Sequence, residues 1–333
     1  MRIQHIIGIC FTIFMCATSV AQEKYIYNLS KAPMHLNPSF HAFKDKTKVG
    51  VLGEFANQTA GTQSQHQYLF GSTHFEDYNF QLGVDLFTNS LANSGYQYTS
   101  GSLSYMYKLQ LPNDWVFYPG ITAGYSNYRF DFNNLTFQDQ IDIFSGQISA
   151  TTIDPITASE NLGYLDLGAS FMVHNDRNMV FGLAIKHLNQ PKISSKQSEN
   201  NVNLNMLISG QFGYEFNINK YGQANLPAFS YIYLFNSVSS QGANMRLDFY
   251  QDLILGNFTI GVNEHISSGE AFNFSELGVF SSIAIESFEF GLNYRMPFGE
   301  EAKLYIPNSV ELFLTLDLTS FSGNRRGDYS RFY

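Results

Sequence analysis

The chain has 333 residues, enough for one large domain or two of ordinary size. Charged residues make up only 14%, against about 25% in an average soluble domain, while aromatic residues reach 16% and are nearly all Phe and Tyr. A mean hydropathy of −0.15, with no apolar run of about 18 residues after residue 21, argues against a bundle of membrane helices. A net charge of −9 and a pI near 5.3 offer no basic surface for nucleic-acid phosphate. Together these features suggest a membrane β-barrel and exclude a disordered chain.

The amino terminus has the pattern of a secretory signal peptide. Arg2 supplies a positive charge, residues 6–16 form an apolar stretch of suitable length, and Ser19-Val20-Ala21 supplies small residues at a cleavage site. We therefore expect residues 1–21 to be removed on export. Both cysteines, Cys10 and Cys16, lie in this segment, so the mature chain is expected to fold without disulfides or thiolate metal sites.

Apolar and polar residues alternate along almost the whole mature chain. In residues 80–86, four apolar side chains share one face of a predicted strand, while Gln81 and Asp85 lie on the other. Residues 164–173, 288–296 and 310–318 repeat the pattern, with Phe313 as an apolar exception on the polar face. Period two over about ten residues is typical of membrane barrels, whose strands face lipid on one side and the lumen on the other. Strands of soluble sandwiches also alternate but typically span about five or six residues.

This pattern predicts an all-β fold, a transmembrane antiparallel β-barrel of about 14 strands and of outer-membrane type. The predicted strand centres are Val51, Phe70, Val84, Tyr105, Ile121, Gly168, Leu183, Ser209, Tyr231, Leu247, Ile260, Phe280, Leu292 and Leu314. The turn between the tenth and eleventh strands falls either at Gln251-Asp252 or at Gly256-Asn257.

The connections between the predicted strands alternate in length. The even-numbered ones are short and lie at Glu76-Asp77, Pro112 to Asp114, His174 to Asn178, Lys220 to Asn225, 251–257 and Glu286-Ser287. The odd-numbered ones are longer and lie at Ala56 to Ser64, Thr88 to Ser94, Phe132 to Leu162, Asn189 to Asn200, His265 to Phe274 and Pro297 to Asn308, with only Ser237 to Gln241 brief. Short periplasmic turns and longer outer loops are the outer-membrane pattern. The even strand count then places both termini in the periplasm.

A closed barrel pairs all its backbone groups, so its interior can carry polar side chains. We expect seven charged residues to line the lumen and to form ion pairs with one another: Asp85, Asp166, Arg246, Asp248, Glu289, Arg295 and Asp317. Five tyrosines near strand ends suit the aromatic girdles at the membrane interfaces: Tyr96, Tyr98, Tyr107, Tyr125 and Tyr128.

Motifs for catalysis, cofactors or metals are missing from the sequence. The eight histidines are scattered, and no H-E-x-x-H pair, Cys/His cluster, G-x-S-x-G elbow or Walker-type loop occurs. A catalytic triad can also assemble from distant strands of a barrel, which one sequence does not exclude. We expect no enzyme, no catalytic residue, no cofactor and no metal site.

Segments in a fixed order after the signal peptide carry a family resemblance. They read Tyr25-Ile26-Tyr27-Asn28 with Leu36-Asn37-Pro38-Ser39-Phe40, then Leu135-Thr136-Phe137-Gln138-Asp139-Gln140, then His187-Leu188-Asn189-Gln190-Pro191, and finally Ser309-Val310-Glu311-Leu312. Over essentially the whole mature chain these segments resemble the PorP/SprF family of type IX secretion system membrane proteins. That family typically shows Y-x-x-N, L-N-P-A-Y, L-T-F-x-D-Q and H-L-x-Q-P. Here Ser39-Phe40 replaces Ala-Tyr, and Lys44-Asp45-Lys46 follows where glycine is more usual.

The resemblance implies a bacterial outer-membrane barrel that serves secretion or surface display of large proteins, including adhesins used in gliding motility. It implies no catalytic activity. The implied partners are a secreted surface protein or adhesin, periplasmic components of the secretion apparatus, and outer-membrane lipid, with no nucleic acid. An outer-membrane channel for small solutes stays open as the alternative, because a barrel of about 14 strands can hold either a plug or a ligand path.

The motif residues have candidate roles. Asn37-Pro38 is expected to form a rigid, extended lead into the first strand, because proline fixes φ and restricts the residue before it. The candidate partner-binding residues of the long loop are Leu135, Thr136, Phe137, Asp139 and Gln140, with a loop packed over or into the barrel mouth as the alternative. His187, Gln190 and Pro191 end a strand and start a loop, and both a structural and a partner-binding role suit them.

The expected organisation is a signal peptide at 1–21, a segment leading into the barrel at 22–46, the barrel at 47–318 with its long outer loop at 132–162, and a periplasmic tail at 319–333. In this tail, Arg325, Arg326 and Arg331 stand against the single acid Asp328 and alternate with aromatic residues. Arginine and aromatic side chains commonly anchor interfaces, so the tail is a candidate docking segment for the secretion apparatus. The alternatives are a disordered end or a signal for barrel assembly.

Overall fold

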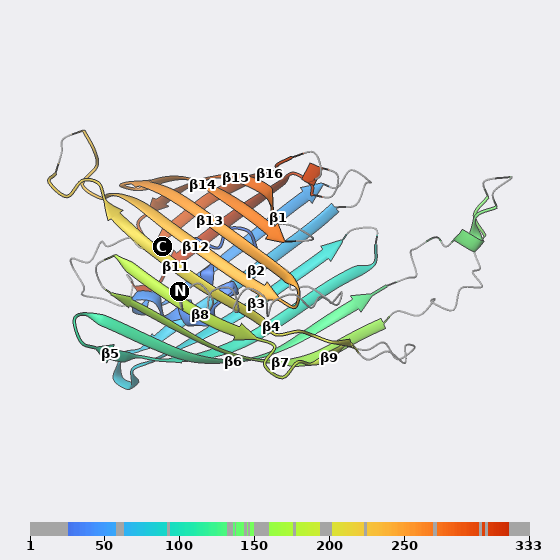
Figure 1. Cartoon of the computed structure of the whole chain (residues 1–333), viewed down its shortest axis with the longest axis horizontal. Coiled ribbons are helices and arrows are strands. Elements are labelled where there is room, and N and C mark those ends of the chain that lie inside the picture. The colour runs from blue at the N-terminus through green and yellow to red at the C-terminus, as the bar shows by residue number, and fades with distance from the viewer. Residues whose placement is uncertain are drawn as a thin grey trace, which may run out of the picture.

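The computed structural model describes residues 26–57, 63–91, 94–131, 136, 138–142, 145, 147–149, 160–175, 178–193, 202–222, 225–268, 272–299, 302–303 and 306–319. Fourteen antiparallel strands form a closed barrel, in which β1 pairs with β17 and β4 pairs with β6 (Figure 1). No described helix is long and apolar enough to cross a membrane. The barrel strands are β1 Lys48–Asn57, β2 Gln63–Phe75, β3 Phe80–Leu91, β4 Tyr96–Tyr107, β6 Trp115–Phe130, β7 Glu160–Asn175, β8 Met179–Lys186, β11 Leu207–Asn217, β12 Ser230–Gln241, β13 Asn244–Leu255, β14 Phe258–Ser268, β15 Phe272–Ile285, β16 Phe288–Pro297 and β17 Ser309–Asp317.

Three short strands and four short helices complete the described structure. β5 Leu109–Leu111 pairs with β6 just beyond the end of β4, and β9 Lys192–Ile193 pairs with β10 Val202–Asn203. The 3₁₀ helices are η1 Pro33–His35, η2 Pro38–Asp45, η3 Glu76–Tyr78 and η4 Gln138–Gln140. The predicted fold class is confirmed, and each of the predicted strand centres lies on a barrel strand. The turn whose position was open falls at Gly256-Asn257, between β13 and β14.

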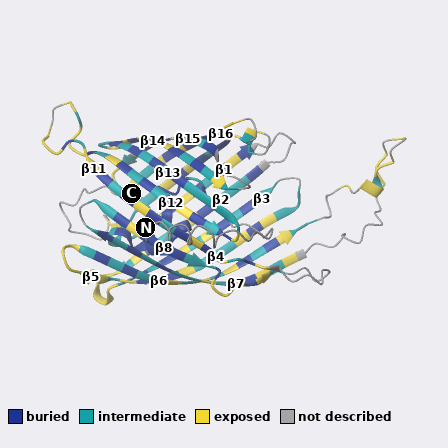
Figure 2. Cartoon of the chain, viewed as in Figure 1, coloured by how far each residue is buried: buried dark blue, intermediate teal, exposed yellow. Residues whose placement is uncertain are grey.

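The two faces of the wall differ as the period-two pattern predicts. On β3, Val84 and Leu86 point outward and are 45% and 48% exposed, whereas Gln81 is buried inside. The same alternation of exposed and buried positions runs around the barrel (Figure 2). An outer surface of this kind suits lipid, because lipid offers apolar contact but no hydrogen-bond partner. Phe313, the apolar exception on β17, is buried inside and stacks on Phe280.

The tyrosine girdle is only partly as expected. Tyr107 and Tyr125 are exposed on the outer surface, at 41% and 55%. Tyr98 and Tyr128, by contrast, are buried in the lumen, with their ring centroids 4.7 Å apart. Their assignment to the girdle was wrong because both occupy inward positions of their strands. There the Tyr98 hydroxyl donates a hydrogen bond to the Ser126 hydroxyl.

The two ends of the barrel carry different sets of connections. We call the end where β1 begins and β17 ends the terminal rim, and the opposite end the loop rim. At the loop rim the connections span residues 58–62, 92–95, 131–159, 187–206, 242–243, 269–271 and 298–308, and at the terminal rim 76–79, 112–114, 176–178, 218–229, 256–257 and 286–287.

The predicted alternation of connection lengths therefore holds only in part. The strands run further toward the loop rim than predicted, so the connections at 92–95 and 269–271 are short, and β12 continues to Gln241. Strand pairing continues in these stretches because polar residues such as Ser90, Ser239 and Ser267 still fit an inward or rim position. At the terminal rim, the connection at 218–229 is longer than expected.

The segment before the first strand lies inside the barrel. We call Ile26–Lys46 the strap; every residue from Asn28 to Phe43 is buried. The expectation that Asn37-Pro38 leads in extended form into the first strand was wrong, since Pro38 begins helix η2 inside the lumen. Proline is well tolerated in the first turn of a helix, where no backbone donor is needed, and the Asn37 side chain caps that turn by accepting a bond from the Ser39 N–H.

Glycines on the wall make room for alternate residues of the strap. A Cβ added at Gly182 would lie 2.5 Å from the Asn37 amide nitrogen, and one at Gly83 would lie 2.4 Å from the His41 ring. At Gly120, between them, an added Cβ would lie 2.9 Å from the Ser39 hydroxyl. These inward positions on β8, β3 and β6 thus bring the strap backbone close to the wall.

The tight fit at Gly83 can be tested by adding one methyl group. Gly83→Ala should push the fully buried His41 ring, lower the free energy of unfolding by about 1–3 kcal/mol, and speed amide hydrogen exchange in residues 34–44. Urea titration in detergent and hydrogen-exchange mass spectrometry measure both effects. Gly53→Ala is the matched control, because its nearest neighbouring atom lies 3.8 Å away. Equal exchange in the two variants would show that the strap is not held by this fit.

Candidate functional site

The lumen and the strap that crosses it form the candidate site. The strap starts near the loop rim, where the Tyr27 N–H donates to Glu311 on the third residue of β17. It then reaches toward the terminal rim, where Lys31 pairs with Glu289 on the second residue of β16. The strap then turns back toward the loop rim through η1 and runs to the terminal rim again in η2. There Lys46 pairs with Asp317, the last residue of β17. The strap therefore links both ends of the barrel from the inside.

An aromatic side chain between two arginines holds the first end of the strap. The guanidinium groups of Arg246 and Arg295 both lie over the Tyr27 ring. Burial raises the pKa of the Tyr27 hydroxyl, so the ring remains neutral between the two cations. Such cation–π contacts strengthen when they are removed from water, as they are here.

Carboxylates on the wall balance the two arginines. Arg295 donates a hydrogen bond to Glu54 at 2.6 Å and forms an ion pair with Glu276 at 2.8 Å. Arg246 lies 2.6 Å from Asp248, which also pairs with His265. The expectation of ion pairs between wall residues is therefore met for Arg246 with Asp248. Buried charges require such partners because the lumen wall offers them little water.

The middle ion pair joins the strap to the wall near the terminal rim. The Lys31 ammonium lies 2.8 Å from the Glu289 carboxylate, with side chains 2% and 13% exposed. The same ammonium lies 5.1 Å from the Phe280 ring centroid and 5.9 Å from that of Phe313. Burial lowers the pKa of Lys31, and Glu289 opposes that shift. The inward position of Phe313 follows from this contact, because its ring forms part of the Lys31 site.

Polar contacts fix the centre of the strap to three strands, β3, β7 and β11. The Asn37 amide donates to Gln211 at 2.9 Å and to the Phe171 carbonyl at 3.1 Å. Two steps along, Ser39 and Ser170 share a hydrogen bond of 2.8 Å. Two steps further, His41 lies 2.8 Å from Asp85, which also accepts a bond from the Tyr68 hydroxyl. Alternate residues of the strap, Asn37, Ser39 and His41, thus contact the wall through their side chains.

The carboxy-terminal end of the strap is bound to the wall at the terminal rim. Asp45 accepts hydrogen bonds from Lys108 and, at 2.7 Å, from the Tyr118 hydroxyl. With Lys46 on Asp317, these contacts place the strap's last turn against β4, β6 and β17. The prediction that the wall charges pair with one another was wrong for Asp85, Glu289 and Asp317, whose partners are His41, Lys31 and Lys46 of the strap. The strap thus supplies partners for three of the wall's carboxylates.

Histidines, which the sequence shows only as scattered, gather inside the barrel. All seven that follow the expected signal peptide have side chains facing the lumen, and five of them lie next to a carboxylate: His41, His66, His74, His187 and His265. Within the described part of the chain, no group of three or more His, Cys, Asp or Glu side chains could hold a metal ion. These five histidines are part of the network of polar contacts that fills the interior of the barrel.

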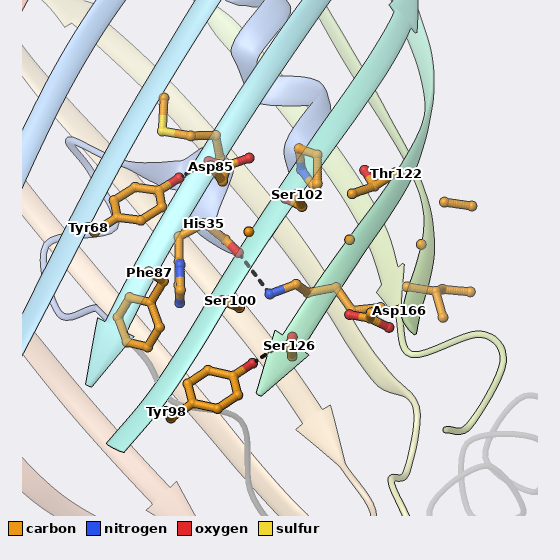
Figure 3. A pocket seen from close by; sticks show the side chains of 18 residues that line it. His35, Tyr68, Asp85, Phe87, Tyr98, Ser100, Ser102, Thr122, Ser126 and Asp166 are labelled. Carbon is orange, nitrogen blue, oxygen red and sulfur yellow. Dashed lines mark hydrogen bonds between the residues drawn. The ribbon is translucent and has the colours of Figure 1, made fainter. Parts of the chain in front are cut away.

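A pocket remains between the strap and one side of the wall (Figure 3). Its floor is built of small residues in register on adjacent strands, with Ser102 of β4 opposite Gly124 of β6. Asp85 and Asp166 flank this row on β3 and β7. On the strap side the His35 carbonyl accepts a bond of 3.3 Å from Lys186. The space contains about 620 Å³, including solvent, and the small wall residues leave the strap unpacked on this side.

The third motif segment forms a turn that redirects the chain after β8. Asp166 accepts bonds from both the backbone N–H and the ring of His187, at 3.1 and 2.9 Å. His187 and Gln190 have positive φ angles of 58° and 41°. His187 and Pro191 are buried, whereas Gln190 is exposed. The turn sends the chain outward into the β9–β10 hairpin at the loop rim.

The described part of the long loop does not form the plug over the barrel mouth that was one of the two expectations. Figure 1 shows η4, the short green helix at the far right, standing well clear of the strand ends. Thr136 and Asp139 are exposed and Gln140 is half-buried. Leu135 and Phe137, and the tail residues Arg325, Arg326 and Arg331, lie outside the described residues. Sequence reasoning missed the strap itself, including Lys31 and His41, whose only signals were charges in a segment with no strand pattern.

Comparison with known protein families gives one match. The model of the family described as "Type IX secretion system membrane protein PorP/SprF" matches residues 18–316. No curated protein matches the chain significantly.

Among solved structures, the chain is similar to the outer membrane protein Omp33 of Acinetobacter baumannii, with 10% identity, a TM-score of 0.45, and 82% of this chain and 97% of that one covered. It is also similar to the Ralstonia pickettii toluene transporter TbuX, with 10% identity, a TM-score of 0.47, and 85% and 92% covered. For the monoaromatic hydrocarbon channel TodX, in a deletion mutant, the identity is 8%, the TM-score 0.48, and the covered shares 87% and 94%.

The buried pair of Lys31 and Glu289 provides a test of the strap's attachment. Lys31→Met leaves the Glu289 carboxylate buried without its cation, so the free energy of unfolding should fall by about 3 kcal/mol. Adding Glu289→Gln removes the unpaired charge and keeps an acceptor for Ser282, so the double variant should recover most of that loss. Urea titration in detergent measures both. A double variant less stable than Lys31→Met alone would contradict the account.

Proposed function

We propose, since this chain belongs to the PorP/SprF family of type IX secretion system membrane proteins, that it is an outer-membrane barrel that receives, exports or anchors a large secreted surface protein. A gliding adhesin is one partner of this kind. The proposal assigns the protein an interaction role and no catalytic step.

The observation that carries the proposal is the strap. It crosses the lumen from the loop rim to the terminal rim and is bound to the wall by Tyr27, Lys31, His41 and Lys46. A channel for small solutes, the alternative function, needs a continuous water path through the lumen. A strap with buried ion pairs and hydrogen bonds favours a barrel whose lumen is blocked. A barrel with a blocked lumen acts through its rims, where partners on either side of the membrane can bind.

We propose that the terminal rim faces the periplasm and the loop rim faces outward. The longest connections, 131–159 and 187–206, lie at the loop rim, as the outer loops of such barrels do. The start of β1 and the end of β17 then lie on the periplasmic side. The first described residue, Ile26, differs from a simple periplasmic terminus because the strap carries it inside the lumen toward the loop rim.

The candidate residues divide according to this orientation. Thr136, Asp139 and Gln190 are exposed on loop-rim connections and are placed to meet an exported partner. His187 and Pro191 are buried, so their proposed part is to hold the turn that displays Gln190. On the periplasmic side, the three arginines of the tail, which follows β17, are proposed to bind the secretion apparatus.

Protease accessibility on intact cells tests the orientation. Cleavage should occur near residues 194–195 in the connection after β8 and should spare residues 175–176 at the opposite rim, because only the loop rim is reached from outside. Mass spectrometry of the released peptides locates the cuts, and disrupted cells provide the control in which both positions become accessible. Cutting at 175–176 alone on intact cells would reverse the proposed orientation.

Deleting the gene tests the proposed function. Cells that lack the protein should release into the medium, or retain in the periplasm, a large protein that normally stays on the cell surface. Quantitative proteomics of surface, medium and periplasm measures its location, and expression of the unaltered chain should restore it to the surface. If every surface protein keeps its location while uptake of a small solute falls, the channel alternative replaces the proposal.

A further inference from the structure

A small hairpin stands at the tip of the longest loop-rim connection. We call residues 131–159 the arm. In it the Asp142 N–H donates to the Gln147 carbonyl at 2.9 Å, and the Ser149 N–H donates to the Gln140 carbonyl at 2.8 Å. Ile141 and Ile148 lie between these pairs as an antiparallel bridge. Together with η4, the hairpin lies far from the barrel wall in Figure 1.

The bonding pattern leaves one edge of this hairpin open. Ile141 and Ile148 form a pair without direct hydrogen bonds, so their backbone groups point away from each other, toward the two outer edges. The Ile141 N–H donates to the Gln138 carbonyl within η4. The backbone of Ile148 makes no hydrogen bond among the described residues. An edge strand with unpaired backbone groups is a ready template for another strand.

The two isoleucines share one face and are exposed. Ile141 is 44% exposed and Ile148 is 64% exposed. Directly opposed side chains of a pair without hydrogen bonds lie close together, so the two present a single apolar surface. An isolated two-stranded hairpin is marginally stable in water, and this one has no described core beneath it. In the described part of the arm, the hairpin thus displays apolar surface and an open edge away from the barrel wall.

The charge of the arm indicates what can bind it. Its 29 residues contain four acids, Asp131, Asp139, Asp142 and Asp154, and no lysine or arginine. The described acids of the tip, Asp139 and Asp142, are exposed. An anionic lipid surface would repel such a tip, whereas a protein edge with basic side chains would attract it.

We propose that the arm hairpin, through Ile148 and the paired Ile141, adds to an exposed β-strand edge of the exported partner, with Asp139 and Asp142 facing basic side chains of that partner. The inference rests on the proposed function and names the part of the barrel that holds the partner and the kind of surface that it recognises. Main-chain hydrogen bonds along the edge supply affinity, and the isoleucine pair supplies specificity.

The probe is the surface protein that is released into the medium or retained in the periplasm when the gene is deleted, purified from that fraction. Its binding to the full-length barrel in lipid nanodiscs is measured by biolayer interferometry. Ile141→Ser with Ile148→Ser should raise the Kd at least tenfold, and Asp139→Asn with Asp142→Asn should raise it and flatten its dependence on salt. Phe298→Ser is the matched control, because Phe298 is 54% exposed at the same rim and lies outside the arm and the turn that carries Gln190. Its Kd should not change.

The outcomes separate this inference from the proposed function. If deletion displaces no surface protein into the medium or the periplasm, the proposed function fails and this inference fails with it. If a protein is released and binds the isoleucine double variant as tightly as the unaltered chain, the arm is not its docking site and the inference is overturned.

A lipid-binding arm is distinguished by a dye that reports polarity, attached to Ser149→Cys. With the barrel in nanodiscs alone, the dye should emit as it does in water. The emission of the dye should shift to the blue when the released protein is added. A blue emission in nanodiscs alone would assign the arm to the lipid surface and overturn the proposal.

Discussion

The structure depends on one constraint: a barrel in lipid turns its polar residues inward, and inward charges need partners. Because one face of every strand is committed to apolar contact, the other face collects charged residues such as Asp85, Glu289 and Asp317. The strap places Lys31 against Glu289, Lys46 against Asp317 and His41 against Asp85. The wall and the strap are therefore complementary parts of one interior, in which buried wall charges pair partly with other wall residues, as Arg246 does with Asp248, and partly with the strap.

The same constraint explains the shape of the strap. A chain that crosses a polar lumen must also satisfy its own backbone, and the strap does so with two short helices and an asparagine cap at Asn37. Alternate residues of the strap pack against glycines of the wall, and the two ends of the strap are fixed at opposite rims. Space remains beside the small residues of β4, β6 and β7, and also near the terminal rim between Lys31, Lys46 and the wall at Glu289 and Asp317. The loop rim and the terminal rim are mechanically linked through Tyr27, Lys31 and Asp45.

The wall was predictable from the sequence and the interior was not. Period-two alternation locates Val84, Leu292 and Leu314 on strands and on the outer face, because lipid contact imposes the same rule at every second position. The partner of an inward charge is set by three-dimensional packing. The charges of Lys31 and Lys46 therefore gave no sequence signal of their pairing with Glu289 and Asp317, which follow 258 and 271 positions later. Pro38 could be read equally as an extended lead or as the first turn of a helix, and only the cap of Asn37 decides between them.

The central claim is that the strap closes the lumen, and the conductance of single barrels in planar bilayers tests it most directly. The account predicts that the full-length protein, purified in detergent and inserted into the bilayer, shows no steady ion current over a range of voltages. A stable, reproducible single-channel conductance of the unaltered chain would contradict it, because ions would then pass a strap that the structure places across their path.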